Sequence, residues 1–205
     1  MVSAEDTGGD YYDIIRTRPG GIITIGDVTG HGLNSGILKM MVHTTLRSLT
    51  YLDQHDIQGL YKVVNRILYD FRIRNEDNRI MTLAILRCLS DGNFQLTGEH
   101  ESLLRLMPQA EAADGSEPPF SHEITPIEFG MYAGLEQDVE RYLRTFEFRM
   151  QPGEVMLLYT DGLREAVSRE EEEFGLEGII AAAAPRLGQS AAEIKQGVID
   201  ACFEH

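Results

Sequence analysis

Residues 26–32, with the sequence GDVTGHG, decide how this chain folds and what it can bind. Residues 22–25 before them are apolar and typical of a buried strand, and residues 33–49 after them are typical of a helix. The stretch therefore joins a strand to a helix and places one carboxylate, that of Asp27, at the strand end. Its three glycines let backbone and carboxylate approach one small ligand closely. A metal ion and a phosphate both suit such a turn.

Composition narrows the function classes. The chain has 205 residues, enough for one sizeable domain, and a formal net charge of -15, which argues against nucleic-acid binding because phosphate contacts need a basic surface. The two cysteines, Cys88 and Cys202, lack metal-binding spacing and favour free thiols. The sequence has neither a long apolar run nor a signal-peptide start. We therefore expect a cytoplasmic protein without direct membrane contact.

The hydrophobic pattern predicts a mixed architecture. Apolar runs and alternation predict strands at residues 14–15, 22–26, 80–86, 94–97, 103–106, 145–150 and 155–159. Apolar residues at helical spacing predict helices over 33–49 and 57–71, and a capping box at Ser190 and Glu193 opens another. The 33–49 helix is apolar nearly all round, so we expect it to be buried, Met40 and Met41 included. Hairpin-joined strands and paired helices indicate an α+β fold, with residues 108–122 as an exposed loop.

Three aspartates share one sequence context. Asp10 follows two glycines, while Asp27 and Asp161 each end an apolar strand next to a glycine. Any one of them could be an ordinary turn or helix-cap residue. Carboxylates converging from several strand ends need a cation, and oxygen ligands alone favour Mg²⁺ or Mn²⁺. The pattern therefore indicates a candidate metal site while leaving the structural interpretation open.

Together these stretches resemble a known family. Residues 8–13 (GGDYYD), 26–32 and 158–162 (LYTDG) are similar, in order and approximate spacing, to the bacterial branch of the protein phosphatase 2C (PPM) family. This branch includes the sporulation stage II protein E phosphatase and the sigma-B regulatory phosphatases. Weaker matches lie at 81–83, 98–101 and 173–175. The resemblance spans residues 8 to about 180.

The resemblance implies a fold and a metal site. The fold would be a four-layer αββα sandwich, in which two antiparallel sheets are flanked by helix pairs. The site would hold two Mn²⁺ or Mg²⁺ ions and hydrolyse phosphoserine or phosphothreonine with a metal-activated water. By position, Asp27 would bridge the ions, the Val28 carbonyl would bind one, Asp161 the other, and Asp10 would bind directly or through water.

The resemblance also implies a biological setting. The substrate would be a phosphorylated STAS-type anti-sigma-factor antagonist. Residues 1–205 would form a single catalytic domain of a longer regulator, which would carry a sensor or receiver domain upstream. The regulator could form a homodimer. The family's final Asp-Asp-x-Thr strand has no counterpart before His205. We therefore expect a shortened domain with impaired metal binding. A phosphatase-like binding module without catalytic activity is the alternative.

Other residues near the motifs have simpler interpretations. His31 could orient the loop or simply pack in the turn, and His100 with Glu101 fits a structural hairpin turn better than a catalytic role. A nucleotide-phosphate loop at residues 26–32 is disfavoured because the Lys-Ser/Thr pair of a P-loop and the GxGxxG spacing are both missing.

Overall fold

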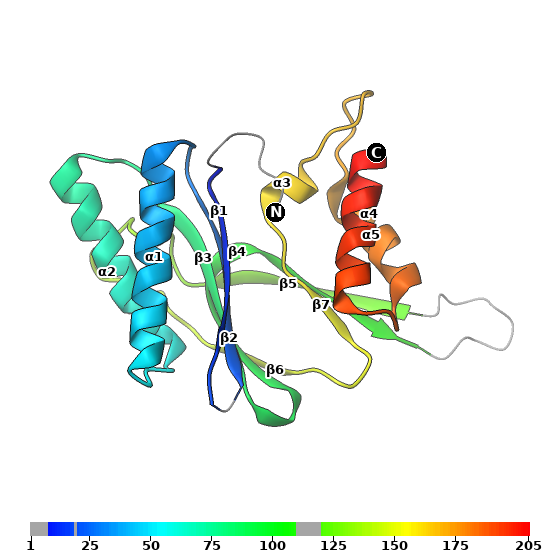
Figure 1. Cartoon of the computed structure of the whole chain (residues 1–205), viewed down its shortest axis with the longest axis horizontal. Helices are drawn as coiled ribbons and strands as arrows, with labels where there is room; N and C mark the ends of the chain where they lie inside the picture. Colours follow the sequence, from blue (N-terminus) through cyan, green and yellow to red (C-terminus); the bar gives the residue numbers. More distant parts are fainter. Residues whose placement is uncertain (1–7, 19, 110–119) are drawn as a thin grey trace, which may run out of the picture. The chain divides into compact units, whose positions relative to one another are not determined.

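The computed structural model of the chain describes residues 8–18, 20–109 and 120–205 (Figure 1). These residues form two compact units. One comprises Met1–His100 and Ile127–Met150, and the other comprises Glu101–Pro126 and Gln151–His205. The expected exposed loop at 108–122 falls mainly on residues 110–119, outside the described residues.

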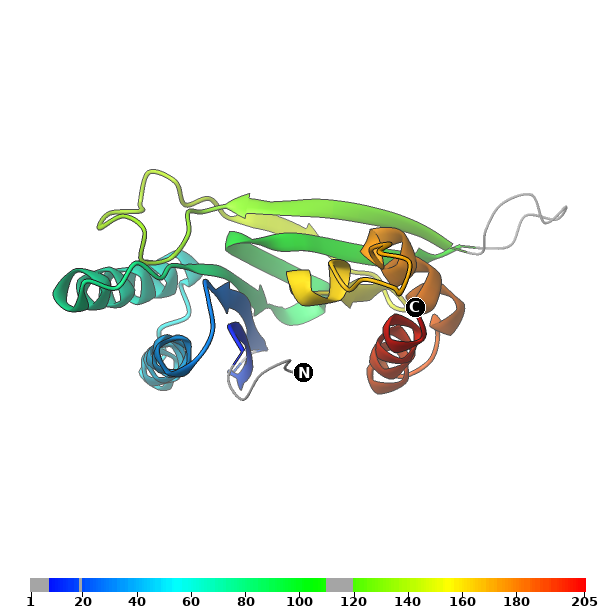
Figure 2. The ribbon, with the colours of Figure 1, turned by 90° about the horizontal axis from the view of Figure 1, so that it is seen from above.

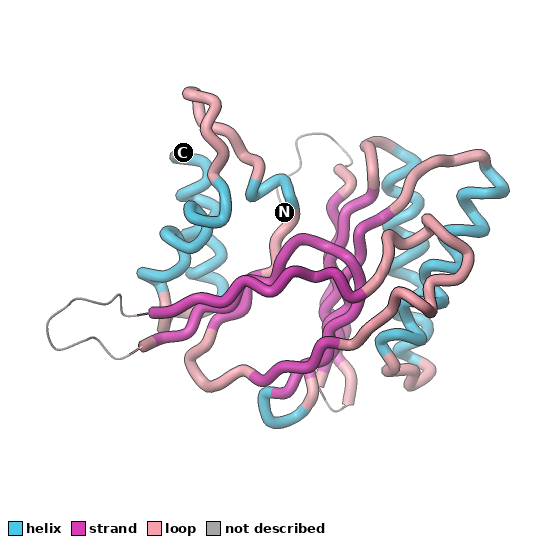
Figure 3. Tube along the Cα trace, turned by 180° about the vertical axis from the view of Figure 1, so that it is seen from behind, coloured by secondary structure: helices cyan, strands magenta, loops and turns pink. Residues whose placement is uncertain are grey.

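The strands confirm the α+β class. They are β1 (Asp10–Arg16), β2 (Gly21–Val28), β3 (Met81–Cys88), β4 (Asn93–Pro108), β5 (Phe120–Phe129), β6 (Phe146–Arg149) and β7 (Val155–Leu157). They belong to one hydrogen-bonded network in the order β1-β2-β3-β4-β5, with β6 and β7 both pairing with β4. Pairing is antiparallel between β1 and β2, β2 and β3, β3 and β4, and between β4 and each of β6 and β7. Figure 3 shows these strands in magenta.

The first unit is a helix pair on a sheet. Helices α1 (Leu33–Tyr51) and α2 (Ile57–Asn75) lie side by side against β1–β3 in both Figure 1 and Figure 2. In β1, side chains alternate between buried and partly or fully exposed positions, as expected for a strand with one face on a core. Buried side chains of both helices and of β1–β3 form one cluster, which includes Leu46, Leu60 and Leu83. This core fixes the strand ends that carry the candidate site.

Helix α1 is less buried than its composition predicts. Its inner face is buried at intervals of three or four residues, including Leu38, Val42 and Leu46. Leu33 and Met40 are instead 77% and 61% exposed. The expectation of a helix buried all round was wrong for this outer face, because only one side of α1 meets the strands and α2.

The second unit has its own core. It contains β7, α3 (Asp161–Arg164), α4 (Gly175–Ala183), α5 (Ala191–Glu204) and the short 3₁₀ turn η2 (Ala184–Arg186). A further 3₁₀ turn, η1 (Ser90–Gly92), lies in the first unit. Helices α4 and α5 pack on each other through side chains such as Ile179, Ile194 and Val198. The predicted capping box at the start of α5 is confirmed: Ser190 Oγ accepts from the Glu193 N–H, and Glu193 Oε2 accepts from the Ser190 N–H.

Strand β4 corrects one boundary. Residues 94–97 and 103–106 were expected to be separate strands with a hairpin turn at His100 and Glu101, yet all belong to the continuous β4. Gly98 has a φ of +115°, and a Cβ at this position would collide with the Leu83 carbonyl oxygen. Glycine therefore keeps β4 against β3 through a local distortion that resembles a turn in the sequence. The hairpin-turn interpretation of His100 was wrong for the same reason.

Candidate metal centre

The predicted ligands of the first unit lie on neighbouring strands. Asp27 is the penultimate residue of β2, rather than a residue of the turn that follows, and it faces Asp10 of β1 in the antiparallel register. On its other side it faces Thr82 of β3. Directly opposed residues of antiparallel strands point to the same face of the sheet, with Cα atoms about 5 Å apart. Asp10, Asp27 and Thr82 therefore form one row across three strands.

Gly9 makes the row compatible with a cation. A Cβ built on Gly9 would collide with both Asp27 Oδ1 and the Val28 carbonyl oxygen. These two oxygens, one carboxylate and one carbonyl, therefore converge on the same small space. The Val28 N–H donates to the Gly9 carbonyl at 3.2 Å, which keeps this backbone close to β2. Because Mg²⁺ and Mn²⁺ prefer such oxygen ligands, the residues present fit the implied ions.

The segment after Asp27 runs as predicted into helix α1. Gly30 and Gly32 have φ values of +82° and +91°, so the turn uses a backbone conformation that favours glycine. Thr29 Oγ1 donates to the Ile80 carbonyl at 3.2 Å and accepts from the Ile80 N–H at 3.1 Å. These two bonds hold the turn against the start of β3. The His31 side chain is exposed.

The second carboxylate of the GGDYYD stretch has a structural role. Asp13 is 7% exposed, and its two carboxylate oxygens accept from Arg47 Nε at 2.9 Å and Arg47 Nη2 at 2.7 Å. His43 Nδ1 lies 3.2 Å from Asp13 Oδ2. These hydrogen bonds raise the pKa of Arg47 above its usual value. Asp13 thus anchors α1 to β1, whereas Asp10 lies on the opposite face of β1.

Two tyrosines beside the candidate aspartates are held neutral. Burial raises the pKa of Tyr11 to about 12, and its hydroxyl oxygen accepts from Thr24 Oγ1 at 3.2 Å. Burial also raises the pKa of Tyr159 to about 12, with Glu101 adding to the effect. Both phenols are therefore protonated at neutral pH.

Asp161 lies in the other unit. It is the first residue of the short helix α3, and its carbonyl oxygen accepts from the Glu165 N–H at 2.7 Å. Arg164 of the same helix forms an ion pair with Glu101 at 3.2 Å. Across the described residues, no group of three or more His, Cys, Asp or Glu side chains gathers closely enough to hold a metal ion. The structure thus brings together Asp10, Asp27 and the Val28 carbonyl, and Asp161 remains a predicted ligand.

Thr82 and His100 were missed as site residues. Thr82 Oγ1 accepts from the Asp27 N–H at 2.8 Å and lies 2.9 Å from His100 Nδ1. Thr82 stood only in a weak motif match, and His100 was interpreted as a turn residue. The signal that could have found them is the strand register, which requires the structure.

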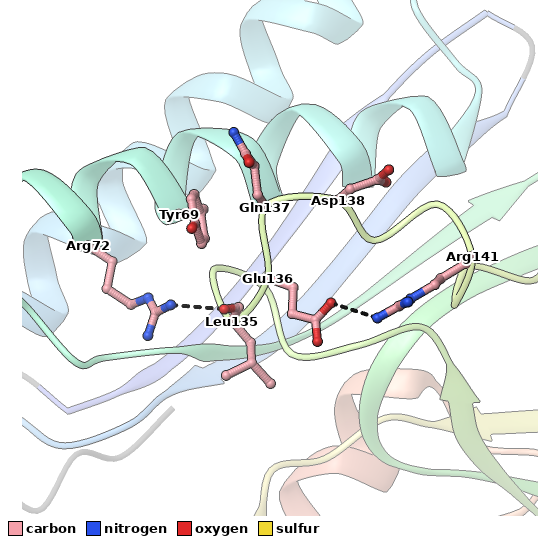
Figure 4. Close-up of a pocket in the computed structure, with 7 residues that line it drawn as sticks. All are labelled: Tyr69, Arg72, Leu135, Glu136, Gln137, Asp138 and Arg141. Atoms are coloured by element: carbon pink, nitrogen blue, oxygen red, sulfur yellow. Dashed lines mark hydrogen bonds and ion pairs between the residues drawn. The ribbon is translucent and has the colours of Figure 1, made fainter.

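A cavity of about 420 Å³ lies apart from these residues, between α2 and residues 135–141 (Figure 4). Its polar side chains already hold the loop. Arg72 Nη2 donates to the Leu135 carbonyl at 2.9 Å. The fully buried Asn65 side chain donates to two loop carbonyls and accepts from a loop N–H. These bonds anchor the loop to α2.

Comparison with known proteins places this arrangement in a family. The chain is 25% identical over 170 residues to the phosphoserine phosphatase RsbU of Bacillus subtilis (strain 168), covering 80% of this chain and 45% of RsbU. The chain thus spans less than half the length of that curated relative. No helix in the described residues is long and apolar enough to cross a membrane.

Two solved structures share the fold. The SiaA-PP2C domain of Pseudomonas aeruginosa matches with a TM-score of 0.71 and 18% identity, over 97% of this chain and 74% of that domain. RsbX, solved in complex with magnesium, matches with a TM-score of 0.62 and 15% identity, over 97% of this chain and 82% of RsbX. The model of the stage II sporulation protein E (SpoIIE) family matches residues 20–205. The expected PP2C-type fold is therefore confirmed, and the chain belongs to the SpoIIE family.

Proposed function

We propose that this chain is the catalytic domain of a metal-dependent protein serine/threonine phosphatase. The observation that carries the proposal is the convergence of Asp27 Oδ1 and the Val28 carbonyl oxygen on the space beside Gly9. Membership of the SpoIIE family and the similarity to a phosphoserine phosphatase support it.

The residues have distinct roles in this proposal. Asp27 and the Val28 carbonyl would hold an ion from the end of β2, Asp10 would add a direct or water-mediated ligand from β1, and Asp161 would serve a second ion. When bound, two Mn²⁺ or Mg²⁺ ions would polarise a phosphoryl oxygen and supply a nucleophilic water at neutral pH. The likeness to RsbX, which was solved with magnesium, supports the choice of ion.

We further propose a substrate class. A phosphoserine on a STAS-type anti-sigma-factor antagonist fits the family resemblance and the phosphoserine specificity in RsbU's name. The whole protein would then be a cytoplasmic regulator in which an upstream sensor or receiver domain controls this domain, with homodimerisation possible.

The test is release of inorganic phosphate from a serine-phosphorylated STAS protein by the full-length enzyme, with and without Mn²⁺. Asp27→Ala should abolish the Mn²⁺-stimulated release. Asp70→Ala is the matched control, because Asp70 forms a surface i,i+4 pair with Arg66 on α2, away from the candidate ligands. Unchanged turnover of Asp27→Ala would refute the metal assignment.

A binding module without catalytic activity is the second candidate. The observation that favours it is that the described residues hold no cluster of three metal-ligating side chains. Calorimetric titration of the full-length protein with Mn²⁺ separates the two functions. Absence of binding at millimolar Mn²⁺, together with retained binding of the phosphorylated partner, would establish the module.

A further inference from the structure

The row of Asp10, Asp27 and Thr82 continues into a fourth strand. In the β3–β4 pairing Leu83 faces Glu99, so Thr82 and His100 are the next residues along the two strands. Their side chains meet, with Thr82 Oγ1 lying 2.9 Å from His100 Nδ1. A hydrogen-bonded chain therefore runs from the Asp27 N–H through the Thr82 hydroxyl to the imidazole of His100.

The single proton of the Thr82 hydroxyl decides which groups donate and which accept in these hydrogen bonds. The Thr82 oxygen accepts the Asp27 N–H at 2.8 Å, so its single proton is left for one other acceptor. That acceptor is the Asp27 carbonyl oxygen at 3.4 Å, so the hydroxyl has no proton left for His100. The 2.9 Å contact with His100 Nδ1 is then satisfied when the ring nitrogen carries a proton and donates to Thr82 Oγ1.

We infer that His100 is a positioning residue for the candidate metal centre. By donating Nδ1–H to Thr82 Oγ1, it holds that hydroxyl where it accepts the Asp27 N–H and donates to the Asp27 carbonyl, which fixes the backbone of Asp27. The oxygens that converge beside Gly9 belong to Asp27 and to the residue after it, so a shift of this backbone displaces both. Outer partners of this kind hold metal ligands in place and typically change metal affinity 10–100-fold when removed. The inference rests on the proposed function for its metal role only.

A second buried threonine in the same unit provides a control for Thr82. Thr97, a fully buried threonine of β4 in the same unit, donates its hydroxyl to the Arg144 carbonyl at 2.7 Å and has no link to Asp27. Thr97→Val therefore removes a comparable buried hydroxyl without touching the row. It is the matched control for Thr82→Val.

The experiment uses the full-length protein and begins without metal. Nitrogen NMR of the His100 ring at about pH 8, above the usual imidazole pKa, reports the tautomer. We expect a protonated Nδ1. Exchange of the Asp27 amide proton should become about fivefold faster in His100→Leu and stay near the wild-type rate in His100→Asn, whose side-chain N–H can replace the Nδ1–H.

Titration with Mn²⁺ then measures the consequence. His100→Leu and Thr82→Val should weaken Mn²⁺ binding about tenfold, while Thr82→Ser, which keeps the hydroxyl, and Thr97→Val should bind as the wild type does. An unprotonated Nδ1, or Asp27 amide exchange that is unchanged in His100→Leu, would overturn the inference whatever the metal does. A wild-type protein that binds no Mn²⁺ would instead refute the proposed function, while the metal-free measurements would still decide whether His100 fixes Asp27.

Discussion

The substitution Gly9→Ala tests the site with the smallest possible change. It adds one methyl group, and that methyl would lie well inside 3.0 Å of both Asp27 Oδ1 and the Val28 carbonyl oxygen. Gly9 does not have a positive φ, so the backbone itself tolerates alanine. The effect of the substitution is therefore a steric effect on the two oxygens proposed to bind the ion.

The magnitude follows from the geometry. To reach ordinary contact at 3.4 Å, each oxygen must move by roughly 1 Å, or β1 must separate from β2 by a similar amount. Metal–ligand distances tolerate deviations of only about 0.2 Å, so neither oxygen would remain a ligand. We expect Mn²⁺ affinity to fall at least 100-fold, which is about 2.7 kcal/mol of binding free energy. The overpacking should also lower the free energy of unfolding by about 1–3 kcal/mol.

The assay is calorimetric titration with Mn²⁺, accompanied by denaturant unfolding to show that the variant is folded. Gly162→Ala is the control, because Gly162 adjoins the other candidate aspartate and its added Cβ would meet nothing closer than Thr160 Oγ1 at 4.0 Å. Its Mn²⁺ affinity should stay within about twofold of the wild type. A folded Gly9→Ala variant with wild-type Mn²⁺ affinity would refute the reasoning.

Three further predictions concern stability. Asn65→Ala should lower the free energy of unfolding in urea by about 2–4 kcal/mol, because it removes three hydrogen bonds between a fully buried side chain and residues 134–137; a loss below about 1 kcal/mol would contradict this. Ser190→Ala should lower the Tm at neutral pH. The hydrogen bonds of Ser190 lower the pKa of Glu193, so they stabilise the fold while Glu193 is charged, above the usual glutamate pKa, and this stabilisation is lost as pH falls through the lowered pKa. The Tm difference between Ser190→Ala and the wild type should therefore shrink below about pH 4. A difference that stays constant with pH would contradict the cap. Glu99→Gln should raise the Tm at neutral pH and not below about pH 4, because burial raises the pKa of Glu99 and its charged form is disfavoured in the fold; equal Tm values for the two proteins at neutral pH would count against this.

Helices and strands with one dominant apolar period were predictable from the sequence. Helix α2 has its buried side chains at intervals of three or four residues, and its predicted span of 57–71 falls within the observed Ile57–Asn75. The capping box at Ser190 was predictable because both partners lie within four residues. Local signals of this kind need no knowledge of the tertiary fold.

Features that depend on which faces meet were not predictable. An apolar surface all round α1 gives no signal of which side is left uncovered, so the exposure of Met40 was missed. Gly98 and the polar residues after it look like a turn, and only the pairing with β3 keeps them in strand β4. These errors arise because tertiary contacts override the local pattern.

The candidate metal ligands could be predicted from the sequence, but the residues that hold them in position could not. Asp10 and Asp27 were found from glycines and strand ends, and the register places them opposite each other. Thr82 and His100 are separated from Asp27 by 55 and 73 positions along the sequence, and only the order of four strands brings them into one row. The sequence carries no periodic signal for a row that crosses a sheet.

The proposed metal centre is tested by anomalous diffraction at the manganese edge from crystals of the full-length protein soaked in Mn²⁺. We predict a manganese peak bonded to Asp27 Oδ1 and to the Val28 carbonyl oxygen, at roughly 2.1 Å from each. The peak should be lost in crystals of Gly9→Ala. Manganese bound elsewhere in an active enzyme, with none at Asp27 and Val28, would contradict the proposed site.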